Sequence, residues 1–325
     1  MIIARSPLRI TLGGGGTDLP SYYTQHGGFL IAAAIDKHVY VTAHNSFRDD
    51  LLIRYSKIEN VKAVREIEHP IVREALRLLE ISEPGIEITS IADVSAGTGL
   101  GSSGSFTAAL LKALYKFQGS FITTEQLAEL ACRIEIDILG EPIGKQDQYI
   151  AAFGGVTCFE FLPDHEVKAY PLRVRPQQLD ELNDKLVLFS TGNTRSASKI
   201  LQEQKEKTLQ NDTAMIDNLH FIKDLGYRSK QALESGDFVK FGKLLHEHWL
   251  FKKQRSPAMS NSDIDRWYEY ALDHGAIGGK IIGAGGGGFF MFYSEEPSTL
   301  KSALRREGLS ELKFRFEFEG THLLT

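Results

Sequence analysis

Apolar and polar positions recur along the chain with the spacings of both strands and helices. Runs with the spacing of strands cover residues 2–12, 29–42, 51–55, 85–91, 156–161, 185–190 and 289–293. Helical spacing covers residues 70–79, 106–117, 123–139, 198–251 and 262–274. Near residue 185 the mixed strand–helix sequence changes to helix-rich sequence. We therefore expect an N-terminal domain of residues 1–185 and a C-terminal domain of residues 186–325.

The clearest helix follows a glycine-rich stretch near residue 100. Its apolar residues fall at i, i+3, i+4, i+7, i+8 and i+11 and form one stripe: Phe106, Ala109, Leu110, Ala113, Leu114 and Phe117. Ser102 and Ser103 stand just ahead of this stripe, where their hydroxyls are expected to cap the helix. The pattern therefore places two hydroxyl groups at a helix N-terminus, directly after the glycines.

The next predicted helix begins with a capping box, Thr123 followed by Gln126. Glu135 lies at the edge of the apolar face of this helix, so we expect its carboxylate to be half-buried and to have a cation as its partner. A surface salt bridge is the other interpretation. Gly140 ends the helix, and the apolar face consists of Leu127, Leu130, Ala131, Ile134 and Ile138.

Later in the chain the pattern predicts two helix details and a row of core residues. We expect the helical region 198–251 to be interrupted near Gly226 and Gly236, and Ser262 to cap the helix that follows. Towards the end of the chain, charged residues alternate with four apolar residues that we expect in the core: Leu312, Phe314, Phe316 and Phe318.

Composition and charge limit the classes of protein. The chain has 42 acidic and 37 basic residues, and its net charge of −5 argues against binding nucleic acid or an anionic membrane through bulk charge. No run approaches the roughly 20 apolar residues of a membrane span, and the first residues do not resemble a signal peptide. The two cysteines, Cys132 and Cys158, argue against a disulfide scaffold and a Cys-rich zinc site. We expect a cytoplasmic protein that is a monomer or a homodimer.

The distribution of glycine points to the chemistry. Fifteen of the 30 glycines fall in three short stretches, residues 13–16, 97–104 and 278–288. Glycine lets backbone N–H groups approach a ligand closely. Tight turns between strands would account for one such run, but three of this density indicate a chain that wraps a ligand rich in oxygen, most simply phosphate.

The middle stretch also matches the Gly-x-Gly-x-x-Gly pattern of dinucleotide sites at residues 99–104. That site needs an acidic residue about 20 positions further on, at the end of a strand, and here the position falls at the start of the capped helix. A nicotinamide-dependent oxidoreductase is therefore disfavoured. The chain also lacks the P-loop motif and the His-Arg-Asp and Asp-Phe-Gly motifs of protein kinases. A glycine loop that leads into a helix N-terminus remains, and this is an anion site where serine hydroxyls can bind phosphate or Mg²⁺.

The three glycine stretches resemble, in order and spacing, the three motifs of the GHMP kinases (galactokinase, homoserine kinase, mevalonate kinase and phosphomevalonate kinase). Residues 6–18 resemble the first motif, 97–105 the second, nucleotide-binding motif and 280–288 the third. Residues 144–148 are similar to the galactokinase segment that carries the catalytic aspartate. The resemblance spans nearly the whole chain. It implies a two-domain α+β fold with an N-terminal half like domain 2 of ribosomal protein S5 and an α/β sandwich as the C-terminal half.

The same resemblance implies a small-molecule kinase that uses ATP and Mg²⁺. Galactokinases have Gly-Glu-His-Thr-Asp where this chain has four glycines before Thr17 and Asp18, so galactose is not the expected acceptor. The first motif and residues 190–196 are most similar to heptose 7-phosphate kinases and also to the kinase part of fucokinases. We therefore expect transfer to the anomeric hydroxyl of a sugar phosphate, with D-glycero-D-manno-heptose 7-phosphate as the first candidate and fucose or another sugar as the alternative.

Two catalytic residues follow from the resemblance. Asp147 matches the catalytic aspartate, which would orient or deprotonate the acceptor hydroxyl. Arg9 would lie beside Asp147, keep its carboxylate ionised and stabilise charge on the acceptor oxygen. A carboxylate held ionised is a poor base, which favours orientation. Taken alone, Asp147 is more simply a loop aspartate, and the alternative for Arg9 is a strand arginine that faces solvent.

The other site residues come from the same motifs. Glu135 and Ser103, with Ser102 as second choice, would bind Mg²⁺. The nucleotide is expected against the second motif: Gly97, Thr98, Gly99, Leu100, Gly101, Ser102, Ser103 and Gly104. The sugar or sugar phosphate is expected against residues of the first and third motifs and one arginine between them: Gly15, Gly16, Thr17, Asp18, Arg195, Lys280, Gly283 and Gly285. Arg195, Lys280 and the amides of the third motif would hold the phosphate of the acceptor.

Two further hypotheses remain to be weighed. A non-catalytic sensor of sugar and nucleotide on the same fold would bind ATP without consuming it, but the joint presence of Asp147, Arg9, Ser103 and Glu135 argues against it. His246 and His248 are two positions apart on a predicted helix and would face different ways, so we do not expect a metal site there.

Overall fold

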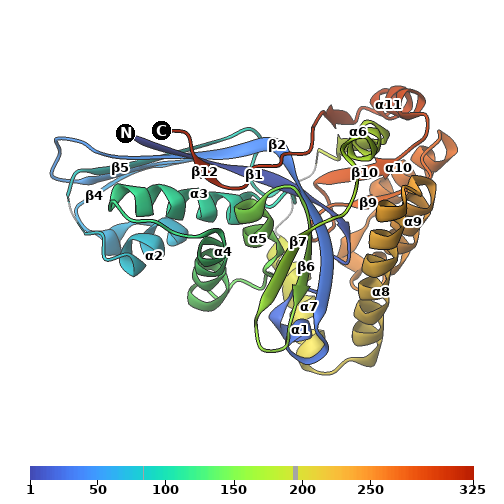
Figure 1. Ribbon diagram of the computed structural model, residues 1–325, viewed down its shortest axis with the longest axis horizontal. Helices are drawn as coiled ribbons and strands as arrows, with labels where there is room; N and C mark the ends of the chain where they lie inside the picture. Colours follow the sequence, from blue (N-terminus) through green and yellow to red (C-terminus); the bar gives the residue numbers. More distant parts are fainter. Residues whose placement is uncertain (83, 193–196) are drawn as a thin grey trace.

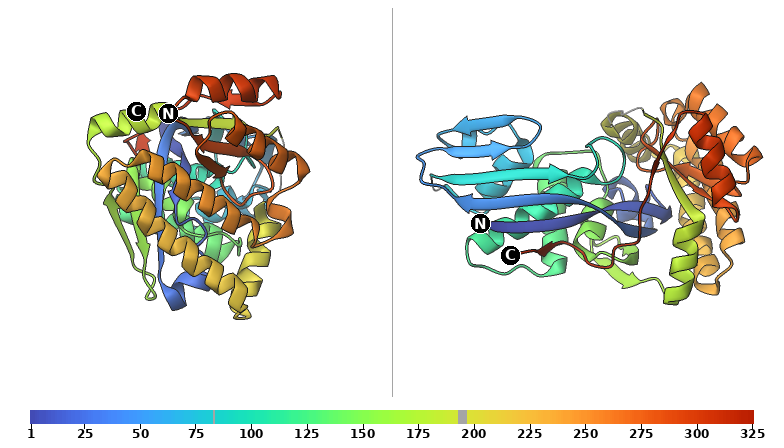
Figure 2. Two further views of the ribbon diagram at one scale, coloured as in Figure 1. Left: turned by 90° about the vertical axis from the view of Figure 1, so that its right-hand side faces the viewer. Right: turned by 90° about the horizontal axis from the view of Figure 1, so that it is seen from above.

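The computed structural model describes residues 1–82, 84–192 and 197–325. Within these residues the chain builds two β-sheets that are covered by helices, with the first sheet on the left of Figure 1 and the second on the right. Turned views in Figure 2 show that the two termini lie next to each other on the first sheet. None of the helices in this described part is both long and apolar enough to cross a membrane.

The first sheet contains the strand that carries Arg9. Its strand order is β12-β1-β2-β5-β3-β4, and β6 pairs with both β2 and β7. The strands are β1 (Ile2–Gly13), β2 (Gly28–Asn45), β3 (Leu51–Arg54), β4 (Ile58–Val61), β5 (Ile86–Ala92), β6 (Val156–Phe161), β7 (Val167–Pro171) and β12 (His322–Leu323). The pairing of β1 with β2 shifts register after Thr11, immediately before the first glycine stretch. Within this central pair Arg9 lies opposite Ala34 of β2.

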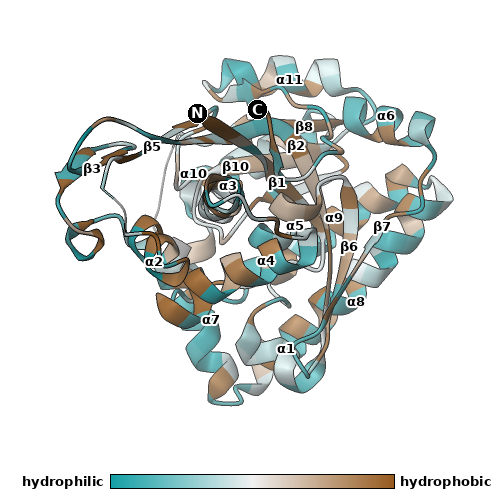
Figure 3. Cartoon of the chain, turned by 60° about the vertical axis from the view of Figure 1, so that its left-hand side comes forward, coloured by the Kyte–Doolittle hydropathy of each residue, from teal (hydrophilic) through white to brown (hydrophobic). Residues whose placement is uncertain are grey.

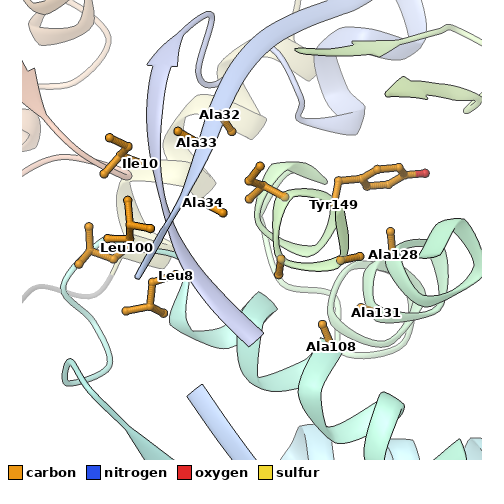
Figure 4. Close-up of a cluster of buried hydrophobic side chains, with 14 of the residues drawn as sticks. Leu8, Ile10, Ala32, Ala33, Ala34, Leu100, Ala108, Ala128, Ala131 and Tyr149 are labelled. Carbon is orange, nitrogen blue, oxygen red and sulfur yellow. The ribbon is translucent and has the colours of Figure 1, made fainter. Parts of the chain in front are cut away.

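Small side chains allow helices to pack closely on this sheet. The helices are α1 (Pro20–His26), α2 (Pro70–Leu78), α3 (Ser102–Phe117), α4 (Thr124–Cys132) and α5 (Gln146–Phe153), with a short 3-10 helix at Val64–Glu66. Figure 4 shows alanines of β2, α3 and α4 gathered with larger residues of β1, of α5 and of the loop before α3: Leu8, Ile10, Ala32, Ala33, Ala34, Leu100, Ala108, Ala128, Ala131 and Tyr149. Because alanine keeps the layers close, the N-termini of α3 and α5 are brought to β1.

The second sheet has the order β11-β8-β10-β9 and is antiparallel throughout. Its strands are β8 (Leu186–Ser190), β9 (Gly278–Ile281), β10 (Phe289–Tyr293) and β11 (Ser310–Leu312). The helices of this half are α6 (Pro176–Lys185), α7 (Ala197–Leu209), α8 (Thr213–Ser235), α9 (Phe238–Lys253), α10 (Ser262–Asp273) and α11 (Pro297–Arg306), with a 3-10 helix at Pro257–Met259. In Figure 3 brown, hydrophobic residues gather on the central strands, and teal ones lie on peripheral helices such as α6 and α8.

Contacts of two helices join the halves. Helix α8 packs against α9 on one side and against β1 and β2 on the other, whereas α9 packs against β9. The chain crosses from the first sheet to the second at Leu186, and β12 returns to pair with β1. The division at residue 185 stays a prediction, because the last strand of the proposed C-terminal domain belongs to the first sheet.

The sequence pattern predicted most elements to within a few residues, and the capping box of Thr123 and Gln126 is confirmed. Several details were wrong. Asn261, not Ser262, caps α10, and Ser102 and Ser103 do not cap α3, whose N-cap is Gly101. Phe318 is 62% exposed instead of lying in the core, because residues after β11 do not continue as a strand, and an isolated bridge pairs Phe316 with Ile35 of the first sheet.

Helix α8 runs without interruption through Gly226, although Gly236 does end it as predicted. Gly226 lies against the first glycine stretch: a Cβ atom there would lie 3.1 Å from Gly14 Cα and 3.0 Å from Phe29 Cδ1. Gly226 therefore leaves room for the first glycine stretch to pack against α8, and it does not break this helix.

Replacing Gly14 by alanine is expected to destabilise the protein by more than about 2 kcal/mol. Gly14 has φ +76°, and a Cβ atom would lie 2.0 Å from the carbonyl oxygen of Phe29, so the alanine suffers both left-handed strain and overlap. Gly119→Ala is the matched control, because Gly119 has φ +71° with no atom within 4 Å of a Cβ. It should cost only about 1–2 kcal/mol. Urea denaturation measures both free energies of unfolding, and equal losses would contradict the packing argument.

Candidate active site

Two cavities meet at Asp147. The larger, of about 650 Å³, lies beside the second glycine stretch, and the smaller, of about 100 Å³, lies beside the first. Residues from four segments far apart in the sequence line both cavities: Arg9, Ile143, Asp147, Leu201, Gly283 and Ala284. A group held by Asp147 is therefore accessible from two separate compartments.

Arg9 and Asp147 form a two-point ion pair at this junction. Arg9 Nε donates to Asp147 Oδ1 at 2.7 Å and Nη2 donates to Oδ2 at 2.9 Å. The third nitrogen, Nη1, donates to the carbonyl oxygen of Gly99. Arg9 is 4% exposed, so the structure places it inside the site and not in solvent. Such a paired guanidinium fixes both the position and the plane of the carboxylate.

Gln146, Thr11 and Gly104 complete the surroundings of Asp147. Gln146 Nε2 donates to Asp147 Oδ1 at 3.0 Å, and Thr11 in turn donates to Gln146 Oε1 at 2.9 Å. Gly104 in the first turn of α3 lets α3 and α5 approach each other closely, since a Cβ atom there would lie 2.9 Å from the backbone of Asp147. The sequence pattern gave no indication of the Gln146 contact.

The second and third glycine stretches touch each other through their backbones. A Cβ atom on Gly283 would lie 2.7 Å from Gly99 Cα, and one on Gly288 would lie 2.3 Å from the carbonyl oxygen of Thr98. The first stretch lies apart from this contact and lines the smaller cavity with Gly15 and Gly16. The three stretches therefore surround the junction together, but only the second and third border the larger cavity.

The larger cavity combines an anion site with an apolar, aromatic wall. The N-terminus of α3 opens towards it with no side-chain cap, so backbone N–H groups and the helix dipole favour an anion there. Tyr55, His69 and Phe106 line its wall, with ring centroids of neighbours 4.7 and 4.9 Å apart. Burial lowers the pKa of His69, which favours an uncharged surface for a planar base.

The eight residues expected at the nucleotide divide into two groups. Lining the larger cavity are Gly97, Gly99, Gly101, Ser102 and Ser103. The other three do not line it, for different reasons. Leu100 is buried in the core, Thr98 donates its hydroxyl to the carbonyl of Ser95, and Gly104 faces Asp147.

Glu135 is more deeply placed than the sequence predicted. It is 2% exposed and accepts a hydrogen bond from Gln148 Nε2 at 2.9 Å. Burial raises the pKa of Glu135 to about 7, although hydrogen bonds from Gln148, Ser103 and Thr107 act in the opposite direction. The expected cation partner is absent from the described residues, so the carboxylate has neutral donors around it.

The position of Glu135 results from a change of helix type. Residues Arg133–Ile138 form a π-helix after α4, and the wider turn shifts the faces that a regular helix would present. Glu135 consequently faces inward, and Ile138, predicted on the apolar face, is 37% exposed. Single π-turns within helices are frequent at functional sites.

The residues around Glu135 fit Mg²⁺. Ser103 hydrogen-bonds to the carboxylate, and the buried hydroxyl of Ser102 has no partner in the described structure. Groups of three or more potential His, Cys, Asp or Glu ligands do not occur among the described residues. A site with one carboxylate and one or two hydroxyls suits Mg²⁺, which keeps several waters and binds to phosphates of a substrate.

The residues expected at the acceptor are only partly brought together. Gly15, Gly16, Asp18, Lys280 and Gly283 line the smaller cavity. Asp18 is buried, and its oxygens accept from the backbone N–H groups of Gln146 at 3.0 Å and Gly16 at 3.1 Å. Burial raises the pKa of Asp18, although the backbone hydrogen bond from Gln146 lowers it.

Two of the expected acceptor residues that the structure describes do not line the smaller cavity. Thr17 is fully buried, and its hydroxyl bonds to the carbonyls of Gly14 and Phe29, so it shapes the loop. Gly285 packs against Met259. Arg195 lies outside the described residues.

The smaller cavity also contains basic residues that sequence reasoning missed. His248, Lys252 and Arg255 line it next to Lys280. The spacing of His248 to His246 does not predict a metal site and gives no other indication of a role for His248. His246 indeed points elsewhere, to the hydroxyl of Tyr268. The useful signal was the helical spacing of 248, 252 and 255, which places His248 and Lys252 on one face of α9 and Arg255 in the turn just after it.

Profiles of a known family match both halves of the chain. The description "GHMP kinases N terminal domain" applies to residues 63–155, and "GHMP kinases C terminal" applies to residues 229–309. The chain belongs to the GHMP kinase family. It is therefore a small-molecule kinase that uses ATP, and the two-domain α+β GHMP-kinase fold expected from the resemblance is confirmed. This family membership excludes the hypothesis that the chain is a nicotinamide-dependent oxidoreductase.

Relatives of this GHMP kinase extend over its full length. A D-glycero-alpha-D-manno-heptose 7-phosphate kinase of Campylobacter jejuni is 30% identical and covers 98% of this chain and 97% of its own. A bifunctional fucokinase/GDP-fucose pyrophosphorylase of Arabidopsis thaliana is 26% identical over 92% of this chain and 30% of its own. The crystal structure of a D-glycero-D-manno-heptose 1-phosphate kinase from Bacteroides thetaiotaomicron superposes with a TM-score of 0.82, is 28% identical and covers 100% of this chain and 99% of its own.

Proposed function

We propose that this GHMP kinase transfers the γ-phosphoryl group of ATP to the anomeric hydroxyl of a sugar phosphate. D-glycero-D-manno-heptose 7-phosphate is the proposed acceptor, because it is named in the relative that matches 98% of this chain. A fucokinase-like activity is the second candidate, supported by the fucokinase relative. We further propose a cytoplasmic location, in line with the two cysteines, which are free and buried.

The single observation that carries this proposal is the place of Asp147 between two cavities. Phosphoryl transfer needs the acceptor oxygen and the leaving oxygen roughly in line with the phosphorus atom. With the nucleotide in the larger cavity and the sugar in the smaller, the acceptor hydroxyl would lie at Asp147. The uncapped N-terminus of α3 would hold phosphate oxygens, and the wall of Tyr55, His69 and Phe106 would hold the base.

The remaining steps concern charge and the acceptor proton. Glu135 and Ser103 would hold Mg²⁺, which when bound neutralises charge on the nucleotide phosphates. Asp147 would accept a hydrogen bond from the acceptor hydroxyl and align its lone pair with the phosphorus. Arg9, next to Asp147, would stabilise negative charge as it develops on the acceptor oxygen. Asp18 would accept a hydrogen bond from another sugar hydroxyl.

A coupled assay of ADP release tests the proposed function. The protein with Mg·ATP is expected to release ADP with heptose 7-phosphate at a far higher kcat/KM than with fucose, galactose or mevalonate. Product analysis should place the new phosphate on the anomeric carbon. Highest activity with fucose would favour the second candidate. ATP binding without ADP release for any acceptor would instead support the non-catalytic sensor.

A further inference from the structure

One wall of the smaller cavity has more basic side chains than the cavity has carboxylates to pair with them. Lys252, Arg255 and Lys280 are 7%, 4% and 2% exposed. The carboxylates in the same cavity are Asp18 and Asp147, and Asp147 is already paired with Arg9. Three buried cations thus face one remaining carboxylate, so the wall would carry about two excess positive charges if all three lysine and arginine side chains were protonated.

Two of these cations have structural partners. Lys252 Nζ donates to the carbonyl oxygens of Ile281, at 2.9 Å, and Gly283. Arg255 Nε donates to Asn218 Oδ1 at 2.9 Å, and its Nη1 reaches the carbonyl oxygen of Gly15 at 3.3 Å. These bonds tie the third and first glycine stretches to the end of α9, so both stretches are held around the same cationic wall.

Lys280 differs from the other two cations. Its Nζ contacts His248 Nδ1 at 3.3 Å, and within the described residues it forms no salt bridge. Burial and the nearby charges of Lys252, Arg255 and Arg9 hold the pKa of Lys280 well below its usual value, and burial also keeps His248 neutral by lowering its pKa. A buried ammonium without a counter-ion is costly, so burial alone favours the neutral amine of Lys280, and an anion bound beside it would stabilise the charged form.

We propose that this wall is a subsite for a phosphate group that the acceptor already carries, and that Lys280 makes the enzyme select phosphorylated acceptors. The inference rests on the proposed function and specifies its substrate class. A phosphate dianion would match the excess charge and supply acceptor oxygens for the unused N–H groups of Lys280. The terminal phosphate of the nucleotide is the other possible source of this chemistry. The acceptor is favoured, since Lys252, Arg255 and Lys280 line the smaller cavity and not the larger.

The proposal is tested with Lys280→Met and with Lys243→Met as control. Lys243 lies exposed on α9, the helix that supports the wall. The ratio of kcat/KM for a sugar phosphate to kcat/KM for the same sugar without phosphate should fall about 10- to 100-fold in Lys280→Met, the range for a lost hydrogen-bonded charge. It should stay at its original value in Lys243→Met. A parallel fall for both sugars, or a raised KM for ATP with the ratio retained, would overturn the proposal.

A melting experiment separates this inference from the proposed function. Inorganic phosphate should raise the Tm of the original protein and raise it much less in Lys280→Met. Without ligand, Lys280→Met should melt no lower than the original protein, because the substitution removes a buried amine that has no ion-pair partner among the described residues. Equal stabilisation of both proteins by phosphate would contradict the subsite even if kinase activity were found. Loss of phosphate stabilisation in the variant would support the subsite even if no sugar tested were phosphorylated.

Discussion

Asp147→Asn is expected to leave ATP affinity intact and to lower kcat about 10²- to 10⁴-fold, the usual contribution of a positioned acid–base group. The asparagine has the size of the aspartate but presents only one acceptor oxygen. One of the two bonds from Arg9 would therefore become a contact between two donors. The measurement is steady-state kinetics with the preferred acceptor, combined with ATP titration.

Asp137→Asn provides the control for this variant, because this substitution makes the same chemical change at an exposed position. It should retain full turnover. An Asp147→Asn enzyme with the kcat of the original protein would remove Asp147 from the mechanism. The size of the loss also separates its two possible roles. An asparagine carbonyl can still orient a hydroxyl, so a loss near the lower limit indicates orientation and one near the upper limit indicates proton acceptance.

Glu135→Gln is expected to make the metal-free protein more stable at pH 8 while weakening its use of Mg²⁺. Burial raises the pKa of Glu135 from 4.5 to about 7, so the folded state binds a proton more tightly than the unfolded state. Stability is then lost as the pH rises above 4.5, and the loss is complete above pH 7. It amounts to at most about 3 kcal/mol. Glutamine does not ionise, so the Glu135→Gln variant does not lose stability in this way as the pH rises.

Thermal melting without divalent metal at pH 5 and pH 8 measures this difference. The advantage of Glu135→Gln over the original protein should be largest at pH 8 and narrow towards pH 5. Glu141→Gln, a change at an exposed glutamate a few residues further on, should show no such pH dependence. An advantage at pH 5 as large as at pH 8 would show that the effect comes from packing and not from ionisation.

The Mg²⁺ requirement of Glu135→Gln is expected to rise at least about tenfold. Loss of a partner that only supports a metal ligand typically costs 10- to 100-fold, and a direct ligand should cost no less. Titration of activity with Mg²⁺ at fixed ATP gives this shift. An unchanged titration would mean that the buried carboxylate does not bind the metal.

Local signals in the sequence predicted much of the fold. Helix α3 has a complete apolar stripe, and the capping box at Thr123 is formed within four residues, so neither depends on distant contacts. The failures depend on tertiary contacts. The spacing rule assumes 3.6 residues per turn, which the π-helix around Glu135 does not obey. Gly226 continues its helix because of packing against Gly14, a partner that only the folded chain reveals.

The candidate site likewise contains residues that the sequence could predict and residues that it could not. The glycine stretches, Arg9 and Asp147 could be predicted because they lie in contiguous motifs, and the structure brings Arg9 and Asp147 together. Lys252 and Arg255 lie in no motif, and they join Lys280 only when α9 packs against β9. Thr17 shows the opposite case, since its place in a motif suggested a ligand contact while its hydroxyl serves the loop itself.

The separate origins of the two cavity walls have an evolutionary consequence. The larger cavity is built mainly from the first sheet and its helices, whereas the cationic wall of the smaller one comes from α9 and β9. On the proposed assignment of the two cavities, mutations in α9 and β9 would alter which alcohol is accepted and leave the ATP site unchanged. Enzymes for different acceptors would then share one donor site.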